Sequence, residues 1–301
     1  MVSLRELSVS GIRKIRIRDE LYPPLLRTIH DPPPVLYAKG SSIESLDMPA
    51  VAIVGSRRAT EHGRQIAMEI ASDLAGRGIA VVSGMAYGID AAAHRGALEG
   101  GGPTISVWGS GVDVVYPAAH RELAERIEGC GLILSEFSPG TQPLPPYFPQ
   151  RNRIISGLSI ATVVVEAAEQ SGSLITAKFA LEQGREVFAV PGRAGEANSR
   201  GTNRLIRDGA ALVECGKDVA ELIAGHLPVA QKAKLTGLLE IDVDKDSPLL
   251  SAMKGNGVVC VDWIVRKAQL AAPIVLEQLT RLVVAGRVAE LPGRRFRLKG
   301  S

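Results

Sequence analysis

Residues suited to binding phosphate gather between positions 151 and 173. Arg151-Asn152-Arg153 come first, the apolar run Ala161–Val165 follows, and Ser171-Gly172-Ser173 then opens an amphipathic segment. Arginine forks form paired hydrogen bonds with phosphate oxygens. The first N–H groups of a helix and the positive end of its dipole also favour anions. This order of residues indicates that the chain holds something polyanionic.

A second group of donors follows an earlier apolar run, Val51–Val54. It reads Gly55-Ser56-Arg57-Arg58. Glycine lets the backbone turn tightly, serine supplies a hydroxyl, and the arginines supply planar donors. We expect this turn to form one wall of a pocket and Ser171-Gly172-Ser173 the other. Lys178, one turn further along the second segment, is a weaker candidate for the same site.

Motifs for common nucleotide chemistry are missing from the chain. No Gly-Lys-Ser/Thr phosphate loop occurs, and Gly109-Ser110-Gly111 lacks the third glycine of a dinucleotide fingerprint. The histidines and cysteines lack metal spacing, and no compact Ser–His–Asp or Cys–His arrangement is present. The sequence therefore predicts no catalytic residue, no metal site and no cofactor.

The elements that must position these residues are short apolar strands alternating with amphipathic helices. Such alternation is typical of an α/β protein with a parallel sheet covered on both faces. Nearly every expected strand ends in Gly or Ser, at the sheet edge where α/β proteins bind ligands. Strands are expected at Val51–Val54, Ile79–Val82, Thr104–Trp108, Leu132–Leu134, Ala161–Val165, Val187–Val190 and Ala211–Val213, and helices at 61–76, Asp90–Leu98, 119–128 and 173–183.

Stretches rich in proline, glycine or charged residues divide the chain into four predicted segments. Residues 1–45 form an N-terminal extension, whose Val35–Tyr37 docks as a strand after a stiff triple proline. Residues 46–225 form an extended Rossmann-like domain, and 226–247 a linker. Residues 248–301 form a small winged-helix-like domain, because two helices precede two short strands. Its expected elements are Val261–Ala268, Ala272–Ala285, Val288–Leu291 and Arg295–Leu298.

Composition bounds the protein class. The net charge of the 301 residues is only +3, so any nucleic-acid binding must rest on local clusters. No apolar run is long enough for a membrane span, and the N-terminus lacks the pattern of a secretory signal. Cys130, Cys215 and Cys260 are few and scattered, as in a reducing compartment, where each is expected to be a small buried side chain. We therefore expect a cytoplasmic protein.

Six motifs in fixed order resemble the DprA/Smf family of bacterial DNA-processing proteins. The match covers roughly residues 21–223 and, more weakly, the C-terminal module. Tyr87 departs from the family pattern, since many relatives carry a basic or aliphatic residue there. The motifs are Val51–Arg57 (VAIVGSR), Ser83–Asp90 (SGMAYGID), Asp113–Pro117 (DVVYP), Phe148–Ile155 (FPQRNRII), Ser171–Ala177 (SGSLITA) and Gly201–Ile206 (GTNRLI).

The resemblance implies a homodimer that binds single-stranded DNA and is not an enzyme. It further implies protection of incoming DNA during natural transformation, and loading of the recombinase RecA against competition from single-strand-binding protein. Carried over by position, the DNA-contacting residues would be Gly55, Ser56, Arg57, Arg151, Asn152, Arg153, Ser171, Gly172 and Ser173, together with Lys178.

Two other functions are weighed against this one. The first is a phosphoribohydrolase-like enzyme on the same fold. In the phosphoribohydrolase family the corresponding loop contains a Gly-Gly pair, and its glutamate comes later in the loop. In this chain the Gly-Gly pair is absent, and Glu166 precedes the loop that ends at Ser173. The second is sequence-specific regulation through the basic tail, but Ala272–Ala285 has few residues suited to reading bases.

Three finer expectations concern the site. Aromatic residues make up only 4% of the chain, so binding should depend mainly on phosphate contacts, with Tyr87, Tyr147 and Phe148 as the stacking candidates. Residues 192–203 should fold over the site as a loop, with Thr202 or Asn203 pointing in. Asp90 is expected to cap the helix that follows it.

Overall fold

The computed structural model divides the chain into two compact units, Met1–His226 and Leu227–Ser301. It describes residues 11–226 and, in the second unit, residues 248–253, 257–268, 270, 275–276, 279, 282, 288–291 and 295–298. The sequence predicts four segments, and the boundaries between them at residues 45, 225 and 247 remain predictions.

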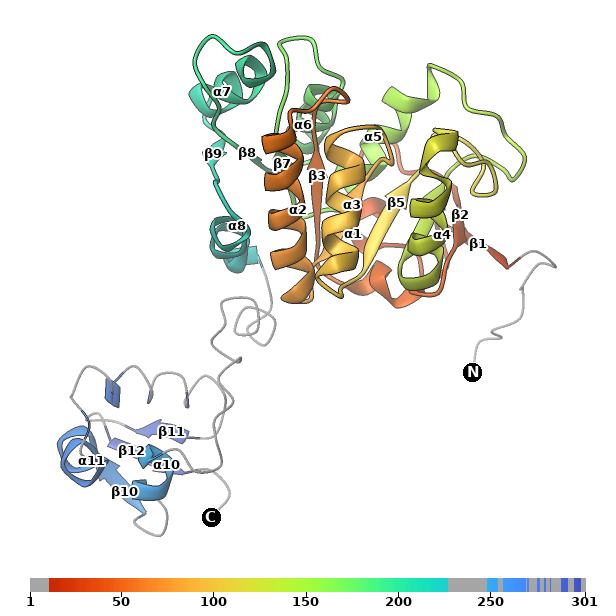
Figure 1. Cartoon of the computed structure of the whole chain (residues 1–301). Coiled ribbons are helices and arrows are strands. Elements are labelled where there is room, and N and C mark those ends of the chain that lie inside the picture. The colour runs from red at the N-terminus through yellow and green to blue at the C-terminus, as the bar shows by residue number, and fades with distance from the viewer. Residues whose placement is uncertain are drawn as a thin grey trace. The chain divides into compact units, whose positions relative to one another are not determined.

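The first unit is built on one nine-stranded sheet with the order β1-β2-β6-β5-β4-β3-β7-β8-β9 (Figure 1). The seven strands from β6 to β9 in this order are parallel, and β1 and β2 are antiparallel to their neighbours. The strands are β1 (Ile12–Arg16), β2 (Val35–Lys39), β3 (Ala50–Val54), β4 (Ala80–Ser83), β5 (Thr104–Val107), β6 (Leu132–Ser135), β7 (Ala161–Val164), β8 (Glu186–Ala189) and β9 (Ala211–Leu212).

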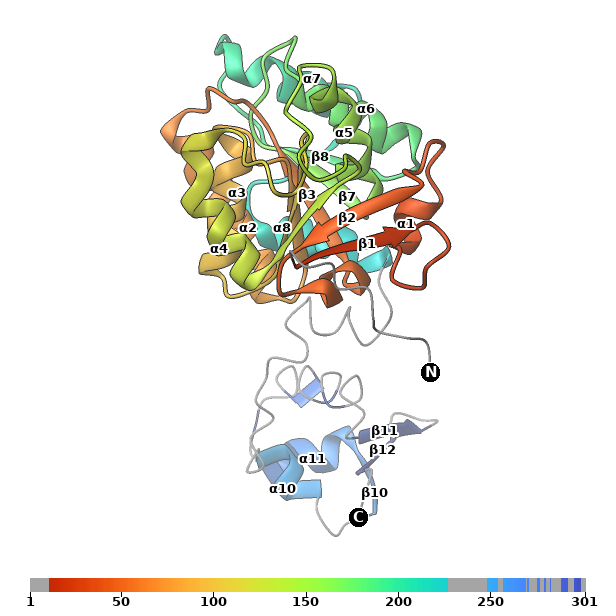
Figure 2. The ribbon, with the colours of Figure 1, turned by 90° about the vertical axis from the view of Figure 1, so that its right-hand side faces the viewer.

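Helices cover both faces of the sheet (Figures 1 and 2). Helices α2, α3 and α4 lie on one face, with α8 packed beside α2, and helices α1, α5 and α6 lie on the other. Because both faces are covered, the central strands β3 to β7 are buried along their whole length. The helices are α1 (Pro24–Arg27), α2 (Glu61–Gly76), α3 (Ile89–Glu99), α4 (Arg121–Cys130), α5 (Tyr147–Gly157), α6 (Ser173–Glu182), α7 (Arg200–Arg207) and α8 (Gly216–Ile223), with short 3₁₀ turns at Ile43–Asp47, Ala118–His120, Ala197–Ser199 and Ala224–His226.

The described part of the N-terminal segment is an integral part of this sheet. Strand β2 contains the predicted docking strand and pairs with β6, and β1 pairs with β2 in turn. Tyr22, Leu26 and Leu36 are completely buried in the core between the sheet and helices α5 and α6. Residues 11–45 therefore complete the core of the first unit, although the sequence suggested a separate extension.

The expected strands and helices of the sheet domain are confirmed to within one or two residues at most ends. Four helices of this unit were not predicted: α1, α5, α7 and α8. The sequences of α5 and α7 contain Pro149 and Gly201, which lower helix propensity, but each residue falls in the first turn, where both are tolerated. The prediction for Asp90 is wrong: Gly88, with φ of 75°, precedes the first turn of α3, and Asp90 lies inside the helix.

The described elements of the second unit fit the predicted winged-helix-like module. They are α10 (Pro248–Met253), β10 (Val258–Cys260), α11 (Val261–Ala268), β11 (Val288–Leu291) and β12 (Arg295–Leu298). The three strands form a sheet in the order β10-β12-β11, of which β10 was not predicted. The predicted helix Ala272–Ala285 lies mostly outside the described residues.

Candidate nucleic-acid interface

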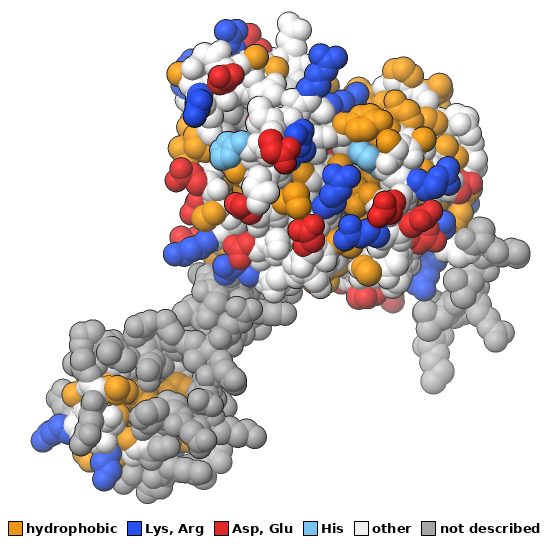
Figure 3. Space-filling model, viewed as in Figure 1, with side chains coloured by type: hydrophobic (Ala, Val, Ile, Leu, Met, Phe, Trp, Pro, Cys, Tyr) orange, Lys and Arg blue, Asp and Glu red, His pale blue; other side chains and the backbone are white. Residues whose placement is uncertain are grey.

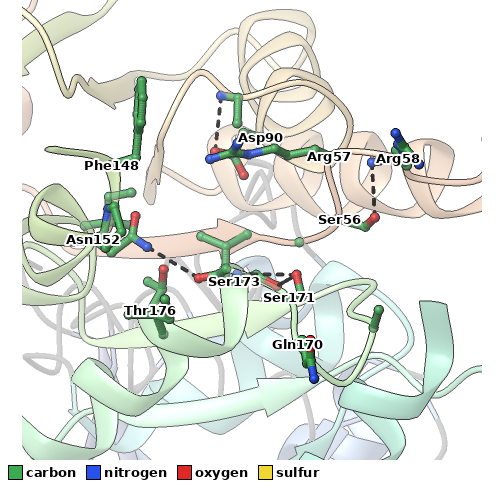
Figure 4. A pocket seen from close by; sticks show the side chains of 18 of the residues that line it. Ser56, Arg57, Arg58, Asp90, Phe148, Asn152, Gln170, Ser171, Ser173 and Thr176 are labelled. Carbon is green, nitrogen blue, oxygen red and sulfur yellow. Dashed lines mark hydrogen bonds between the residues drawn. The ribbon is translucent and has the colours of Figure 1, made fainter. Parts of the chain in front are cut away.

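A pocket of about 530 Å³ opens at the carboxyl ends of β3 and β7 (Figure 4). Strand β3 pairs with β4 on one side and β7 on the other, so chain order reverses here, and such switch points are the ligand-binding crevices of α/β sheets. The lining residues are Val54, Gly55, Ser56, Arg57, Arg58, Ala86, Asp90, Phe148, Pro149, Arg151, Asn152, Ile155, Ala168, Gln170, Ser171, Gly172, Ser173, Ile175, Thr176 and Asn198. Eight of the ten sequence-predicted contact residues are among them.

The turn after β3 forms the first wall. The Ser56 N–H donates to the carbonyl of Glu166, which fixes the turn against the segment after β7, and the Ser56 hydroxyl accepts from the Arg58 N–H. A Cβ atom at Gly55 would collide with the Ile89 side chain, so only glycine fits this close approach. The turn leaves Arg57 exposed, with its guanidinium carbon 5.8 Å from the centre of the Phe148 ring.

The start of helix α6 forms the second wall. The Ser171 and Ser173 hydroxyls lie 2.8 Å apart, and the Ser173 N–H points toward the Ser171 oxygen at 3.4 Å. Asn152 on helix α5 donates to the Gly172 carbonyl at 3.4 Å, which joins the two helices at the pocket. Figure 4 shows these residues facing the Ser56–Arg58 turn across the pocket. This wall therefore combines hydroxyl donors with the positive end of a helix dipole.

Arg151 lines the pocket as a buried strut. It is only 3% exposed, and its guanidinium group donates to the carbonyl of Val107, the last residue of β5, and at 2.7 Å to that of Gly84, which follows β4. Burial lowers its pKa to about 10, although attraction to Asp90 opposes the shift. A Cβ at Gly84 would collide with the Arg151 guanidinium, so this glycine makes room for the strut. Arg151 contributes positive charge to the pocket from below its surface.

Two predicted contact residues lie outside the pocket lining. Arg153 is buried, and its guanidinium forms two hydrogen bonds of 2.7 and 2.8 Å with Glu136 and one of 3.0 Å with Asp31. Burial is the largest single influence on the pKa of Arg153 and lowers it, but the charges and hydrogen bonds of Glu136 and Asp31 together outweigh burial and raise the pKa. Lys178 is exposed and points toward Glu182 at 3.7 Å. In the structure Arg153 links α5 to Asp31 and Glu136, which both precede this helix, and Lys178 lies further along α6.

Asp90 supplies a carboxyl group to the floor of the pocket. The sequence had predicted that this carboxyl group would cap a helix. It is 6% exposed, and one oxygen accepts a weak hydrogen bond of 3.3 Å from the Ala86 N–H. Burial raises its pKa, and the nearby Arg151 and Arg57 partly offset that rise. The positive charges of the two arginines also compensate the negative charge of the Asp90 carboxylate at the pocket floor.

The segment 192–203 contributes a different residue from those expected. Thr202 and Asn203 belong to helix α7, where Thr202 is buried and Asn203 pairs through its amide with the backbone of Gly192. The pocket is instead lined by Asn198, whose amide donates to the Arg58 carbonyl at 2.9 Å. No pattern in the sequence marks Asn198, because its place depends on how the loop folds back.

Glu166, the possible acid or base of the enzyme alternative, lines a second pocket of about 950 Å³ with His62 and Arg193. Its carboxylate accepts hydrogen bonds from the Thr60 backbone and hydroxyl, and a longer one of 3.4 Å from Asn198. These bonds tie the end of β7 to the start of α2. The carboxyl group in the first pocket is Asp90.

Three further findings bear on function. Within the described residues, no group of three or more His, Cys, Asp or Glu side chains could hold a metal ion. No described helix is both long and apolar enough to cross a membrane. Cys130, Cys215 and Cys260 are exposed and unpaired, so the expectation that they are buried is wrong.

The fold and site define a class: Rossmann-like α/β proteins with a polyanion pocket at the switch point, here followed by a winged-helix module. The chain belongs to the DNA recombination-mediator protein A family, whose model matches residues 13–224. A second model, the DprA winged helix domain, matches residues 237–294. The predicted resemblance is confirmed.

Relatives of known sequence or structure support this family assignment. Protein Smf of Escherichia coli is 40% identical over 93% of this chain and 76% of its own length. The crystal structure of DprA from Streptococcus pneumoniae aligns with a TM-score of 0.68 at 44% identity, over 70% of this chain and 74% of that one. DprA from Helicobacter pylori, whose structure concerns its single-stranded DNA binding mode, aligns with a TM-score of 0.65 at 30% identity, over 72% of this chain and 97% of that one.

Proposed function

We propose that the pocket at the β3/β7 switch point holds successive phosphates of one DNA strand. The observation that carries the proposal is the convergence of two donor walls, the Ser56–Arg58 turn and the start of α6, on one cavity. Such contacts read no base edge, so binding is independent of sequence. The solved Helicobacter pylori relative that binds single-stranded DNA supports the choice of ligand.

The proposed contact residues are those that the pocket brings together. They are Gly55, Ser56, Arg57, Asn152, Ser171, Gly172 and Ser173 at the surface, with Arg151 beneath them. Arg153 and Lys178 are left out of this set, because the first is occupied by two carboxylates and the second lies beyond the lining.

The test compares single-stranded and duplex DNA binding by the native chain and by Arg57→Ala with Asn152→Ala. We expect single strands to bind tighter, and the double variant to lose roughly tenfold or more in affinity, since two charge-assisted or polar contacts are removed. The slope of log affinity against log salt should become shallower by about 0.7, because one phosphate contact by a cation is lost.

Arg204→Ala is the matched control, since Arg204 is an exposed arginine on α7 whose partner is Asp208. This variant should bind as the native chain does. Unchanged single-strand affinity in the double variant would exclude the pocket as the DNA-binding site. An affinity that does not depend on salt would exclude binding through phosphate contacts.

We further propose that the chain acts by binding and not by catalysis. The enzyme alternative needs an acid or base at the nucleotide, and the hydrogen bonds of Glu166 to Thr60 and Asn198 tie this carboxylate into the structure. Incubation with nucleoside monophosphates should release no free base. Release of base at a steady rate, abolished by Glu166→Gln, would support the phosphoribohydrolase-like alternative instead.

Membership of a recombination-mediator family supports a wider role. In this role a cytoplasmic homodimer protects incoming single-stranded DNA and loads RecA onto it during transformation and recombination. The pocket supplies contacts to the phosphate backbone that do not depend on sequence, and this role needs them because incoming DNA can have any sequence.

A further inference from the structure

Half of the phenylalanines and tyrosines in the chain lie together beside the pocket. Together these side chains form a group that we call the aromatic ledge. It consists of Tyr87, Tyr116, Phe137, Tyr147 and Phe148, five of only ten such residues in the sequence. They come from four places in the chain: the loops after β4, β5 and β6, and the first turn of α5.

Contacts between rings connect the residues of the ledge in pairs. The centres of Tyr116 and Phe148 are 5.3 Å apart with the planes tilted by 34°, and those of Phe137 and Tyr147 are 4.1 Å apart in a stack. Tyr87 packs its edge on the His120 ring at 4.9 Å. The separations of 5.3 and 4.9 Å lie in the range of favourable aromatic pairs, and the stacked Phe137–Tyr147 pair is closer than that range.

The sheet order gives the ledge a direction. Strands β4, β5 and β6 follow β3 in this order across the sheet, and the loops at their carboxyl ends share one edge with the pocket. Phe148 lines the pocket and also contacts Tyr116, with Arg57 against its ring. The ledge therefore begins at the pocket wall and runs away from it along the edge of the sheet.

Exposure shows that the ledge does more than fill the core. Tyr87 and Tyr116 are each 50% exposed, whereas Tyr22 in the core is completely buried. Hydrophobic side chains gather at the upper right of the first unit in Figure 3, above α4. An exposed group of aromatic rings that is continuous with a phosphate pocket matches the construction of single-strand-binding grooves, where bases stack on rings beside a positive backbone track.

We propose that bases of the strand whose phosphates occupy the pocket stack on the aromatic ledge, with Phe148, Tyr116 and Tyr87 as the stacking residues. This inference rests on the proposed function and assigns base-stacking residues to the same site. Every base has a ring face, so stacking adds affinity without adding sequence preference. Duplex DNA, whose bases are already stacked on each other, cannot use the ledge.

The test uses the full chain and two single-stranded probes of equal length and charge, an oligothymidylate and its abasic counterpart. The native chain should bind the abasic strand at least about fivefold more weakly. Tyr116→Ala and Tyr87→Ala should weaken oligothymidylate binding by about fivefold or more when combined, with no change in affinity for the abasic strand. Their salt slope should equal that of the native chain, because no cation is removed.

Two controls separate stacking from structural damage. Tyr116→Phe keeps the ring and should bind as the native chain does. Leu181→Ala removes an exposed hydrophobic side chain from α6, away from the ledge, and should change nothing. Thermal unfolding of each variant shows whether it is folded.

Three outcomes would overturn the proposal. The first is unchanged oligothymidylate binding by the combined tyrosine variant. The second is an equal loss on both probes, which would mean that the substitutions disturb the phosphate pocket. The third is a loss of self-association in sedimentation with DNA binding intact, which would assign the ledge to a protein interface. Failure of the native chain to bind any single strand would instead refute the proposed function.

Discussion

Arg57, Arg151 and Arg153 carry the same guanidinium group in three different environments. Arg57 is exposed at the pocket wall, Arg151 is buried under the pocket, and Arg153 is paired with Glu136 and Asp31. An exposed guanidinium can meet a phosphate at small cost, while a buried one holds the backbone groups that it contacts. At the residue scale, binding and folding are therefore assigned to different arginines.

The role of Arg151 leads to a stability prediction. Arg151→Ala would leave the buried carbonyls of Gly84 and Val107 without their donor and would create a cavity. We expect the free energy of unfolding to fall by about 2–5 kcal/mol. Urea denaturation measures this, with Arg57→Ala as the control, which should change stability by less than about 0.5 kcal/mol. Equal stability of the two variants would contradict the role of Arg151 as a strut.

At the scale of elements, helix α3 is fastened to strand β5 by one buried histidine. His94 is completely buried, and its Nδ1 lies 2.7 Å from the Thr104 hydroxyl. That hydroxyl donates to the Val81 carbonyl, so Nδ1 carries the proton and donates to Thr104. The Nε2 atom is buried without a partner, and burial, with the charge of Arg151 and His120, lowers the pKa of His94 to about 3.

This shift makes stability depend on pH. The unfolded chain takes up a proton at His94 near pH 6.5 while the folded chain does not, so falling pH favours unfolding between 6.5 and about 3. In the middle of this window His94 should lower the free energy of unfolding by about 1.4 kcal/mol for each unit by which the pH falls. His94→Asn keeps a donor near Nδ1 but cannot titrate, so its stability should fall less steeply. Parallel curves of unfolding free energy against pH for the two proteins would contradict this account.

At the scale of the whole molecule, the pocket and the aromatic ledge both lie in the first unit, Met1–His226. Under the proposed function, the first unit alone would hold a single strand, whereas the proposed recombination role also needs RecA and a second copy of the chain. A net charge of +3 gives the whole molecule only a weak electrostatic attraction to DNA, so binding depends on these local groups.

The recombination role predicts an outcome in an order-of-addition experiment. The full chain should allow RecA to assemble on DNA already coated with single-strand-binding protein, because it competes with that protein for the same strand. Arg57→Ala with Asn152→Ala should lose this activity in proportion to its lost DNA affinity. Sedimentation should give twice the chain mass. Loading that survives in the double variant, or a monomer that loads fully, would contradict the proposal.

The sequence by itself was sufficient to predict the α/β class, most strands, the winged-helix order and the family. The class, the strands and the winged-helix order follow from local patterns, since apolar runs, helical periodicity and glycine turns depend on residues close together in the chain. The family was predicted from the resemblance of six ordered motifs. Most of the pocket could also be predicted, because Gly55, Ser56 and Arg57 follow one strand and Ser171, Gly172 and Ser173 follow another at the same edge.

Only the tertiary structure decided which polar groups are free to bind. Arg153 was predicted as a phosphate contact, but Glu136 and Asp31, distant in sequence, surround it. Asp90, Asn198 and Tyr116 lie at the site because loops from different strands meet there. Burial and pairing of a side chain depend on neighbours brought together by folding, and no spacing along one chain records them.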